Sequence, residues 1–286
     1  MQDQYLIDKA RVRASFDRAA DSYDAAAILQ KQVREEMLSR LDLIKIAPQV
    51  ILDTGCGTGH GSVALQQRFK QAQVISLDLS LSMLQATQAN LPFFKKILGK
   101  KSLICADIEH LPVASNSVDI LWTNLAIQWC NDLDLAFAEA KRVLKPNGLL
   151  MFSTFGPDTL KELRAASKNE HTHVSRFIDM HDIGDALTRT GFNAPVLDVE
   201  NYTLTYDDVK GVMRDLKAIG AHNATAGRPR GLLGKGFLQQ LSQHYEQFRT
   251  DGKLPATYEV VYGHAWKSDK PESISQDFVP IHFKKR

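Results

Sequence analysis

Alternating glycines and two acidic residues are the groups in this chain whose spacing best suits ligand binding. The apolar run at residues 50–52 leads into Asp53, and three alternating glycines follow at Gly55, Gly57 and Gly59. Asp78 ends a second apolar stretch. Glycine costs conformational entropy in a folded loop, so three of them favour a backbone that approaches a ligand over a plain tight turn. The pattern predicts a nucleotide-derived cofactor at the carboxyl ends of a parallel sheet.

The glycine spacing does not match a dinucleotide site. In the pattern G-x-G-x-x-G the last glycine lets a helix close over a pyrophosphate, but positions 60 and 62 are His60 and Ser62. A ligand with a ribose and a cationic amino-acid tail, but no phosphate, suits a tight loop beside two acids. We therefore predict that the chain binds S-adenosylmethionine and that S-adenosylhomocysteine is the product.

Each acid also has a structural interpretation. Asp53 can offset the charge of the methionyl ammonium, or the amides of its own loop can fix its carboxylate. Asp78 can accept both ribose hydroxyls, or it can cap the helix that begins at Ser80. We predict a cofactor role for both acids and include the neighbouring Leu79 in the site.

Four stretches resemble the cofactor motifs of class I S-adenosylmethionine-dependent methyltransferases. They are LDTGCGTG from Leu52, LDLSLSML from Leu77, ADIEHLP from Ala106 and VLKPNGLLMFST from Val143. The resemblance implies a Rossmann-like α/β fold with a mostly parallel seven-stranded sheet, helices on both faces, an antiparallel pair of strands at one edge and a helical lid.

The same resemblance assigns further cofactor residues. It places Asp107 against the adenine amino group, with the Ile108 amide nearby, and Asn124 beside the amino-acid part. Alternatively, Asp107 is a loop acid next to Glu109, and Asn124 caps the end of a strand.

Two further stretches, at residues 124–130 and 216–221, resemble the malonyl-acyl carrier protein O-methyltransferases of biotin synthesis, and the likeness runs from about Arg11 to Trp266. It implies methylation of the free carboxyl group of a malonyl thioester to its methyl ester. A carboxylate is ionised at neutral pH and needs no general base. That chemistry agrees with a sequence in which we find no catalytic His or Cys constellation.

Arg176 and Tyr23 are the candidate substrate residues. We assign Arg176 to the malonyl carboxylate and Tyr23, on a helix expected to cover the cofactor, to lid closure and orientation. Alternatively, Arg176 is an ordinary surface charge and Tyr23 is a packing residue. Trp129 is expected to line the pocket, whereas Trp122 belongs to the core. A basic excess that could steer an acidic carrier protein, or simply form a solvated face, consists of Arg214, Lys217, Arg228, Arg230 and Lys235.

Composition excludes several function classes. The 286 residues carry a net charge of +2, so no global field indicates nucleic acid or membrane binding. No stretch approaches the roughly 20 apolar residues needed to cross a bilayer. The three cysteines lack the spacing of a disulfide framework or a zinc site. We expect a cytoplasmic protein without a metal.

Predicted strands and helices alternate along this part of the chain. The strands are expected at 50–54, 73–78, 102–106, 118–123 and 148–154. A turn at 145–148 ends the helix that precedes the last of these strands. Beyond them we expect helices at 157–168, 181–190, 206–219 and 237–248, strands at 194–204 and 256–266, and a long loop at 220–236. This divides the chain into an amino-terminal helical cover (1–40), a cofactor-binding core (41–155), lid helices with the last strands (156–267) and a disordered tail (268–286).

Three other functions remain open from the sequence. One is a methyltransferase for an isoprenoid or fatty acid. A second is a respiratory-chain assembly factor, because residues 155–164 and 255–258 also resemble the assembly-factor protein hydroxylases that keep this fold. The third is a non-catalytic cofactor sensor.

Overall fold

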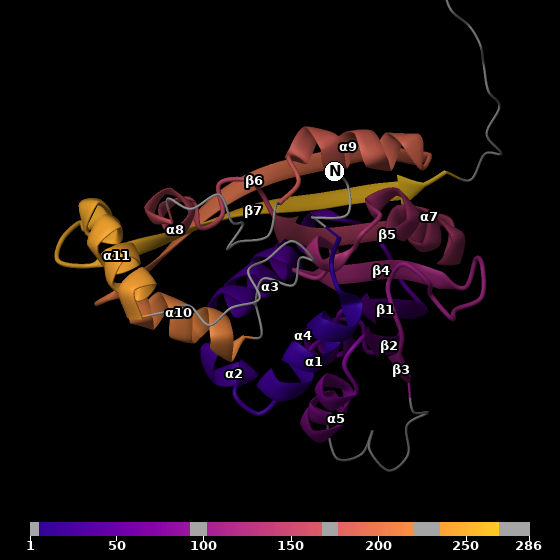
Figure 1. Ribbon diagram of the computed structural model, residues 1–286. Helices are drawn as coiled ribbons and strands as arrows, with labels where there is room; N and C mark the ends of the chain where they lie inside the picture. Colours follow the sequence, from indigo (N-terminus) through magenta and orange to yellow (C-terminus); the bar gives the residue numbers. More distant parts are fainter. Residues whose placement is uncertain (1–5, 92–101, 168–176, 220–234, 269–286) are drawn as a thin grey trace, which may run out of the picture.

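The computed structural model describes residues 6–91, 102–167, 177–219 and 235–268, built around one seven-stranded sheet (Figure 1). The strands lie in the order β3-β2-β1-β4-β5-β7-β6. Strands β1 to β5 pair in parallel, and β7 runs antiparallel between β5 and β6. Their bounds are β1 Val50–Thr54, β2 Gln73–Asp78, β3 Leu103–Cys105, β4 Val118–Asn124, β5 Leu144–Phe155, β6 Phe192–Tyr206 and β7 Leu254–Lys267. The predicted sheet and its antiparallel edge are confirmed.

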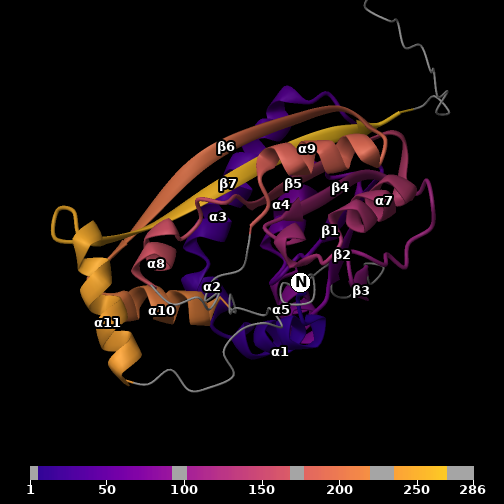
Figure 2. The ribbon, with the colours of Figure 1, turned by 45° about the horizontal axis from the view of Figure 1, so that its top comes forward.

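Helices cover both faces of this sheet. Alternate strand residues face opposite sides, so Ile51 packs with α3 and α4 while Leu52 packs with α7 and α9. Figure 2 shows α7 and α9 on one face and α3 on the other. The helices are α1 Lys9–Ala19, α2 Tyr23–Ala26, α3 Ile28–Arg40, α4 His60–Arg68, α5 Leu81–Asn90, α7 Leu133–Val143, α8 Lys161–Ala166, α9 Met180–Arg189, α10 Val209–Ala218 and α11 Lys235–Tyr245, with short 3-10 turns η2 Leu41–Leu43, η3 Ile127–Trp129 and η4 Glu246–Phe248.

Side-chain caps fix where several helices begin. The carboxylate of Asp8 accepts from the amide of Arg11 at the start of α1, and Asp208 accepts from Gly211 at the start of α10. At α5 the hydroxyl of Ser80 has this role, so the helix begins directly after the end of β2. These caps place helix starts at the carboxyl edge of the sheet, where the loops meet.

The structure corrects three predicted boundaries. Helix α8 starts at Lys161 rather than at 157, because the backbone at 156–160 is bonded to β7: the amides of Gly156 and Leu160 donate to the carbonyls of Glu259 and Thr257. Strand β6 continues to Tyr206, so α10 begins only after its cap. Strand β5 starts at Leu144, with a bulge opposite residues 118–120.

Helices α10 and α11 lie at one end of the long β6–β7 pair (Figures 1 and 2), and α10 contacts α2. Their function as a substrate lid, like the four-part division of the chain, stays a prediction. Most of the loop at 220–236 and the tail from residue 269 lie outside the described residues. Among the described helices, none is both long and apolar enough to span a membrane.

Candidate active site

A cavity lies at the carboxyl ends of the parallel strands, next to the amino-terminal helices. It contains about 640 Å³ of empty space, part of it open to solvent. The loops after β1, β2, β3 and β4 all contribute to its lining. Of the residues predicted from the sequence, the lining includes Tyr23, Gly55, Gly57, Asp78, Leu79, Ile108 and Asn124.

The glycine loop leaves space that side chains would otherwise fill. Gly55 and Gly57 adopt left-handed backbone angles, with φ of 69° and 55°, a region that residues with a Cβ rarely occupy. A Cβ at Gly55 would lie only 2.3 Å from the Cβ of Ala126. One at Gly57 would project toward Tyr23, whose Cε1 would be 3.8 Å away. Gly55 is therefore required by packing, and Gly57 keeps the loop backbone open to the cavity.

Asp78 is a buried acid whose two carboxylate oxygens are held by different amides. Gly57 donates to Oδ2 at 2.9 Å and Ser80 donates to Oδ1 at 2.8 Å. Burial raises the pKa of Asp78 to about 6, although these backbone hydrogen bonds act to lower it. A carboxylate oxygen can accept more than one hydrogen bond, so Asp78 can hold the helix start and also accept from a ligand in the cavity that it lines.

Aromatic side chains form the wall of the cavity next to the amino-terminal helices α1 and α2. The ring of Phe16 meets Trp129 edge-on, with centroids 5.5 Å apart, and lies 6.5 Å from the ring of Tyr23. All three line the cavity, together with Val12. The expected places of the two tryptophans are confirmed, because Trp129 lines the cavity and Trp122 is fully buried in β4.

Asn124 ends β4 at the cavity, but protein partners hold its side chain. Its Oδ1 accepts from the Ser153 hydroxyl at 2.9 Å, and its Nδ2 donates to the Gln30 carbonyl in α3 at 3.1 Å. The next residue, Leu125, also lines the cavity and has a φ of 51°. Such strained residues concentrate at functional sites. The geometry fits the strand-end cap, and a contact between Asn124 and the cofactor stays a prediction.

Asp53 is not part of the cavity lining. Its carboxylate lies behind the glycine loop, where the Ser62 hydroxyl donates to Oδ2 at 2.5 Å and itself contacts the Ser76 hydroxyl at 2.7 Å. With 2% of Asp53 exposed, burial raises its pKa to about 7, opposed by the Ser62 hydrogen bond and by the positive charge of Arg34. From this position Asp53 does not reach the cavity directly. Asp53 would therefore influence a bound methionyl ammonium through the glycine loop or through water.

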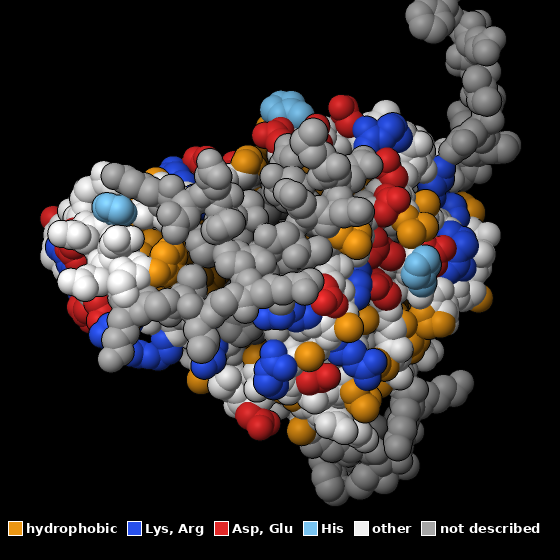
Figure 3. Space-filling view, in the orientation of Figure 1, with side chains coloured by type: hydrophobic (Ala, Val, Ile, Leu, Met, Phe, Trp, Pro, Cys, Tyr) orange, Lys and Arg blue, Asp and Glu red, His pale blue; other side chains and the backbone are white. Residues whose placement is uncertain are grey.

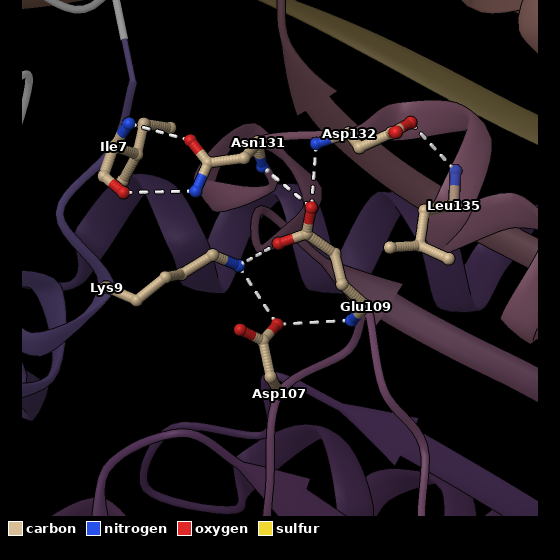
Figure 4. Close-up of polar contacts among 7 residues, drawn as sticks. All are labelled: Ile7, Lys9, Asp107, Glu109, Asn131, Asp132 and Leu135. Atoms are coloured by element: carbon tan, nitrogen blue, oxygen red, sulfur yellow. Dashed lines mark hydrogen bonds and ion pairs between the residues drawn. The ribbon is translucent and has the colours of Figure 1, made fainter. Parts of the chain in front are cut away.

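Asp107 and Gly59 also lie off the lining. Figure 4 shows Asp107 turned toward the amino-terminal segment: its Oδ1 accepts from the Lys9 ammonium at 2.9 Å and from the Glu109 amide at 3.1 Å. Gly59 has a φ of 84° and packs against Thr87, which a Cβ would approach to 2.5 Å. Of the predicted adenine pair, only Ile108 faces the cavity.

The lining chemistry fits an adenosine-containing ligand with a charged tail. Asp78 supplies hydrogen-bond acceptors for hydroxyls, and Gly57 supplies the backbone surface that a Cβ would block. Leu79, Met83 and Ile108 give an apolar surface suited to a flat base. The sequence predicted a tight glycine loop beside two acids, and of these residues Gly55, Gly57 and Asp78 line the cavity, whereas Asp53 and Gly59 do not.

Comparisons with known proteins agree with this chemistry. A family model described as a methyltransferase domain matches residues 52–152. The malonyl-[acyl-carrier protein] O-methyltransferase of a Methylovorus species is 65% identical over 99% of this chain and 97% of its own length. The Gallionella capsiferriformans protein of the same name is 56% identical over 93% of both chains. This chain belongs to the malonyl-[acyl-carrier protein] O-methyltransferase family. It is therefore a methyltransferase, and membership in this family argues against the assembly-factor alternative.

Solved structures confirm the fold of this methyltransferase. The YcgJ protein of Bacillus subtilis superposes with a TM-score of 0.58 at 16% identity, covering 82% of this chain and 99% of its own. A phosphoethanolamine N-methyltransferase of Haemonchus contortus, solved with S-adenosylhomocysteine, gives a TM-score of 0.53 at 18% identity, covering 90% of this chain and 60% of its own. The Rossmann-like class I methyltransferase architecture is thereby confirmed.

Some predicted residues of the methyltransferase lie outside the described part of the chain. These are Arg176, Arg228, Arg230 and the side chain of Lys235. Conversely, the sequence analysis did not assign Val12, Phe16 or Met83 to the site, although all three line the cavity. Val12 and Phe16 are four residues apart on α1, and this spacing indicates that both side chains lie on one face of the helix. That face lines the cavity.

Proposed function

We propose that this methyltransferase uses S-adenosylmethionine to methylate the free carboxylate of malonyl-acyl carrier protein, giving the methyl ester early in biotin synthesis. The observation that carries the proposal is the near full-length 65% identity to a relative of that name. The cytoplasm is the compartment we propose for it.

The cavity supports the cofactor part of the proposal. Asp78 would accept the ribose hydroxyls, Gly55 and Gly57 would border the amino-acid tail, and Leu79 with Ile108 would enclose the base. When bound, the cofactor supplies an activated methyl group on a sulfonium. The task left to the protein is to align the acceptor with that methyl group and to exclude water.

The acceptor itself requires no deprotonation by the protein. Tyr23 is suited to orient it, because burial, helped by the negative charges of Asp78 and Asp24, raises the pKa of its hydroxyl. A tyrosine hydroxyl is protonated at neutral pH even without this shift, so it can donate a hydrogen bond to a carboxylate oxygen. Arg176 remains our sequence-based choice for the second contact with that carboxylate. Phe16 and Trp129 would keep water from the acceptor side.

The direct test compares two acceptors that differ only in the free carboxylate. Malonyl-acyl carrier protein should accept labelled methyl from S-adenosylmethionine, and acetyl-acyl carrier protein should not. The product should release methanol on mild alkaline treatment, as a methyl ester does. Label on an isoprenoid, a fatty acid or a protein side chain, with none on the malonyl group, would contradict the proposal.

The exposed face of α10 supports docking of an acidic carrier. Lys210, Arg214 and Lys217 follow one another at three- and four-residue steps and are exposed, with Met213 36% exposed among them. Figure 3 shows Lys and Arg side chains along the lower edge of the α10 region. Because α10 contacts α2, which carries Tyr23, a carrier seated there would lie near the cavity. Arg228, Arg230 and Lys235 stay proposed members of this patch from sequence alone.

Replacing Arg214 and Lys217 together by alanine should slow methylation of malonyl-acyl carrier protein by about tenfold at low salt, through a higher KM. Malonyl-coenzyme A should be methylated at an unchanged rate. High salt should reduce the wild-type rate on the carrier toward that of the variant, because exposed charges are screened. The matched control is Lys45→Ala with Lys70→Ala, since these exposed lysines precede β1 and β2 at the opposite edge of the sheet. Equal losses on both substrates would place Arg214 and Lys217 in the active-site lid instead.

A further inference from the structure

Between Lys9 and Gln30, side chains and backbone of the amino-terminal segment contact the carboxyl ends of four parallel strands in turn, in the order of the strands in the sheet. Lys9 contacts the loop after β3, Asp17 that after β2, and Asp24 that after β1. Finally, the Gln30 carbonyl accepts from Asn124 at the end of β4. From Lys9 onward the segment thus crosses the carboxyl edge in the order β3-β2-β1-β4, whereas Ile7, which precedes this stretch, is bonded to Asn131 in the loop after β4.

The first tie is an ion-pair cluster (Figure 4). The Lys9 ammonium contacts Asp107 at 2.9 Å and also pairs with Glu109, which is buried and accepts from the amides of Asn131 and Asp132. Burial acts to lower the pKa of Lys9, but its hydrogen bonds to Glu109 and Asp107 raise it overall, so Lys9 stays charged. Two residues earlier, the backbone of Ile7 exchanges two hydrogen bonds with the side-chain amide of Asn131, at 2.7 and 3.0 Å.

The second and third ties use acids of the segment. Asp17 Oδ1 accepts from the Ser80 hydroxyl at 2.6 Å and from the Ser82 amide at 3.2 Å, at the start of α5. Asp24 accepts from the Thr58 hydroxyl at 2.5 Å, and its other oxygen lies 3.1 Å from Nε2 of His60. At both ties, a carboxylate of the segment accepts hydrogen bonds from groups of a loop.

Each tie lies directly beside a residue of the cavity lining. Ser80 follows Leu79, Thr58 follows Gly57, and Asp107 precedes Ile108. The residues of the segment that line the cavity are Val12 and Phe16, between the ties Lys9 and Asp17, and Tyr23, directly before the tie Asp24. The ties thus fix both walls of the cavity relative to one another.

We propose that Lys9, Asp17 and Asp24 are positioning residues that hold the segment of residues 7–30 over the bound cofactor and limit how fast the cofactor leaves. This inference rests on the proposed binding of S-adenosylmethionine. Partly exposed ion pairs add little to global stability. Their effect on a covering segment is larger, because exchange of a bound molecule requires the segment to separate from the loops.

The test follows release of S-adenosylhomocysteine, with no acceptor present. Its rate can be measured by stopped-flow fluorescence, because Trp129 contacts Phe16 of α1. We expect Lys9→Ala, Asp17→Ala and Asp24→Ala each to speed release by about five- to thirtyfold, and Lys9→Arg to restore most of the wild-type rate. Arg11→Ala and Asp21→Ala, exposed residues of the same segment, are matched controls that should change the rate less than twofold.

A second readout separates positioning from a general loss of stability. In the cofactor-free protein, the amides of α1 should exchange hydrogen faster in the three variants, while those of β1 and β4 should exchange as in the wild type. Unchanged release rates, or faster exchange throughout the sheet, would overturn the inference. A wild-type protein that fails to bind S-adenosylhomocysteine would remove its basis. Normal binding without methylation of a malonyl thioester would contradict only the proposed acceptor.

Discussion

Asp78→Ala is expected to weaken binding of S-adenosylmethionine and S-adenosylhomocysteine by about 1–3 kcal/mol, or roughly five- to 150-fold. Asp78 is the buried acid of the cavity lining, and its two oxygens are already oriented by the amides of Gly57 and Ser80. The ribose hydroxyls would lose their acceptors, and Gly57 would lose the bond that holds its peptide at the cavity. Calorimetry at pH 8, where the carboxylate is ionised, measures the effect.

Two further variants test what the two oxygens of Asp78 and its charge contribute. Asp78→Asn keeps one acceptor oxygen for the Ser80 amide, but its amino group cannot accept from Gly57, so binding should weaken although the start of α5 keeps its partner. Asp182→Ala, at an exposed acid of α9, is the control for loss of one negative charge. Unchanged affinity in a folded Asp78→Ala protein would contradict our assignment of the ribose site.

The sequence predicted those features of the site that depend on neighbouring residues in the chain. Gly55 and Gly57 follow a buried strand, and Asp78 ends the next one. Parallel strands bring their carboxyl ends to one edge, so these residues meet in any fold of this class. The antiparallel pair at the edge of the sheet followed from the family resemblance, and the place of Trp129 followed from its position in the loop after β4.

The sequence did not predict the contacts of residues whose partners lie in distant segments of the chain. Asp107 was predicted to face adenine, but it binds Lys9, 98 residues earlier in the chain. Nothing near Asp107 in the sequence indicates this partner. Similarly, Glu259 bonds the backbone around residues 156–159 and delays the start of α8, an effect of a strand that lies a hundred residues further on. Long-range hydrogen bonds override local helix signals at such positions.

The position of Asp53 at the end of a strand could be predicted from the sequence, but the buried environment of its carboxylate could not. It occupies the expected strand end, yet it is buried behind the glycine loop. Burial raises its pKa to about 7, whereas an aspartate exposed to water in the unfolded chain has a pKa of 3.8. Below about pH 4 both states are protonated, so the shift has no effect there. Between about pH 4 and 7 the unfolded state loses the proton first, so stability falls as the pH rises.

Asp53→Asn should therefore stabilise the cofactor-free protein at pH 8 and have little effect on stability near pH 4. The upper bound is about 4 kcal/mol, from a shift of about three pKa units. The asparagine oxygen can still accept from the Ser62 hydroxyl, so the packing is kept. Urea unfolding of both proteins between pH 4 and 8 measures the difference. If the difference in unfolding free energy between the two proteins does not grow with pH, Asp53 has the pKa of an ordinary aspartate.

The same variant should bind S-adenosylmethionine more weakly, although it is more stable. A cationic ligand favours the ionised form of Asp53, so wild-type binding near pH 6 to 7 should release more protons than binding by Asp53→Asn, in which only Asp78 of the two acids can titrate. Burial is the largest cause of the raised pKa of Asp53, and the two charged groups that act on it, Asp78 and Arg34, shift that pKa in opposite directions. S-adenosylhomocysteine lacks the sulfonium charge, so its affinity should depend less on pH. A buried acid that costs stability without a ligand would then be retained because its charge is used when the cation binds.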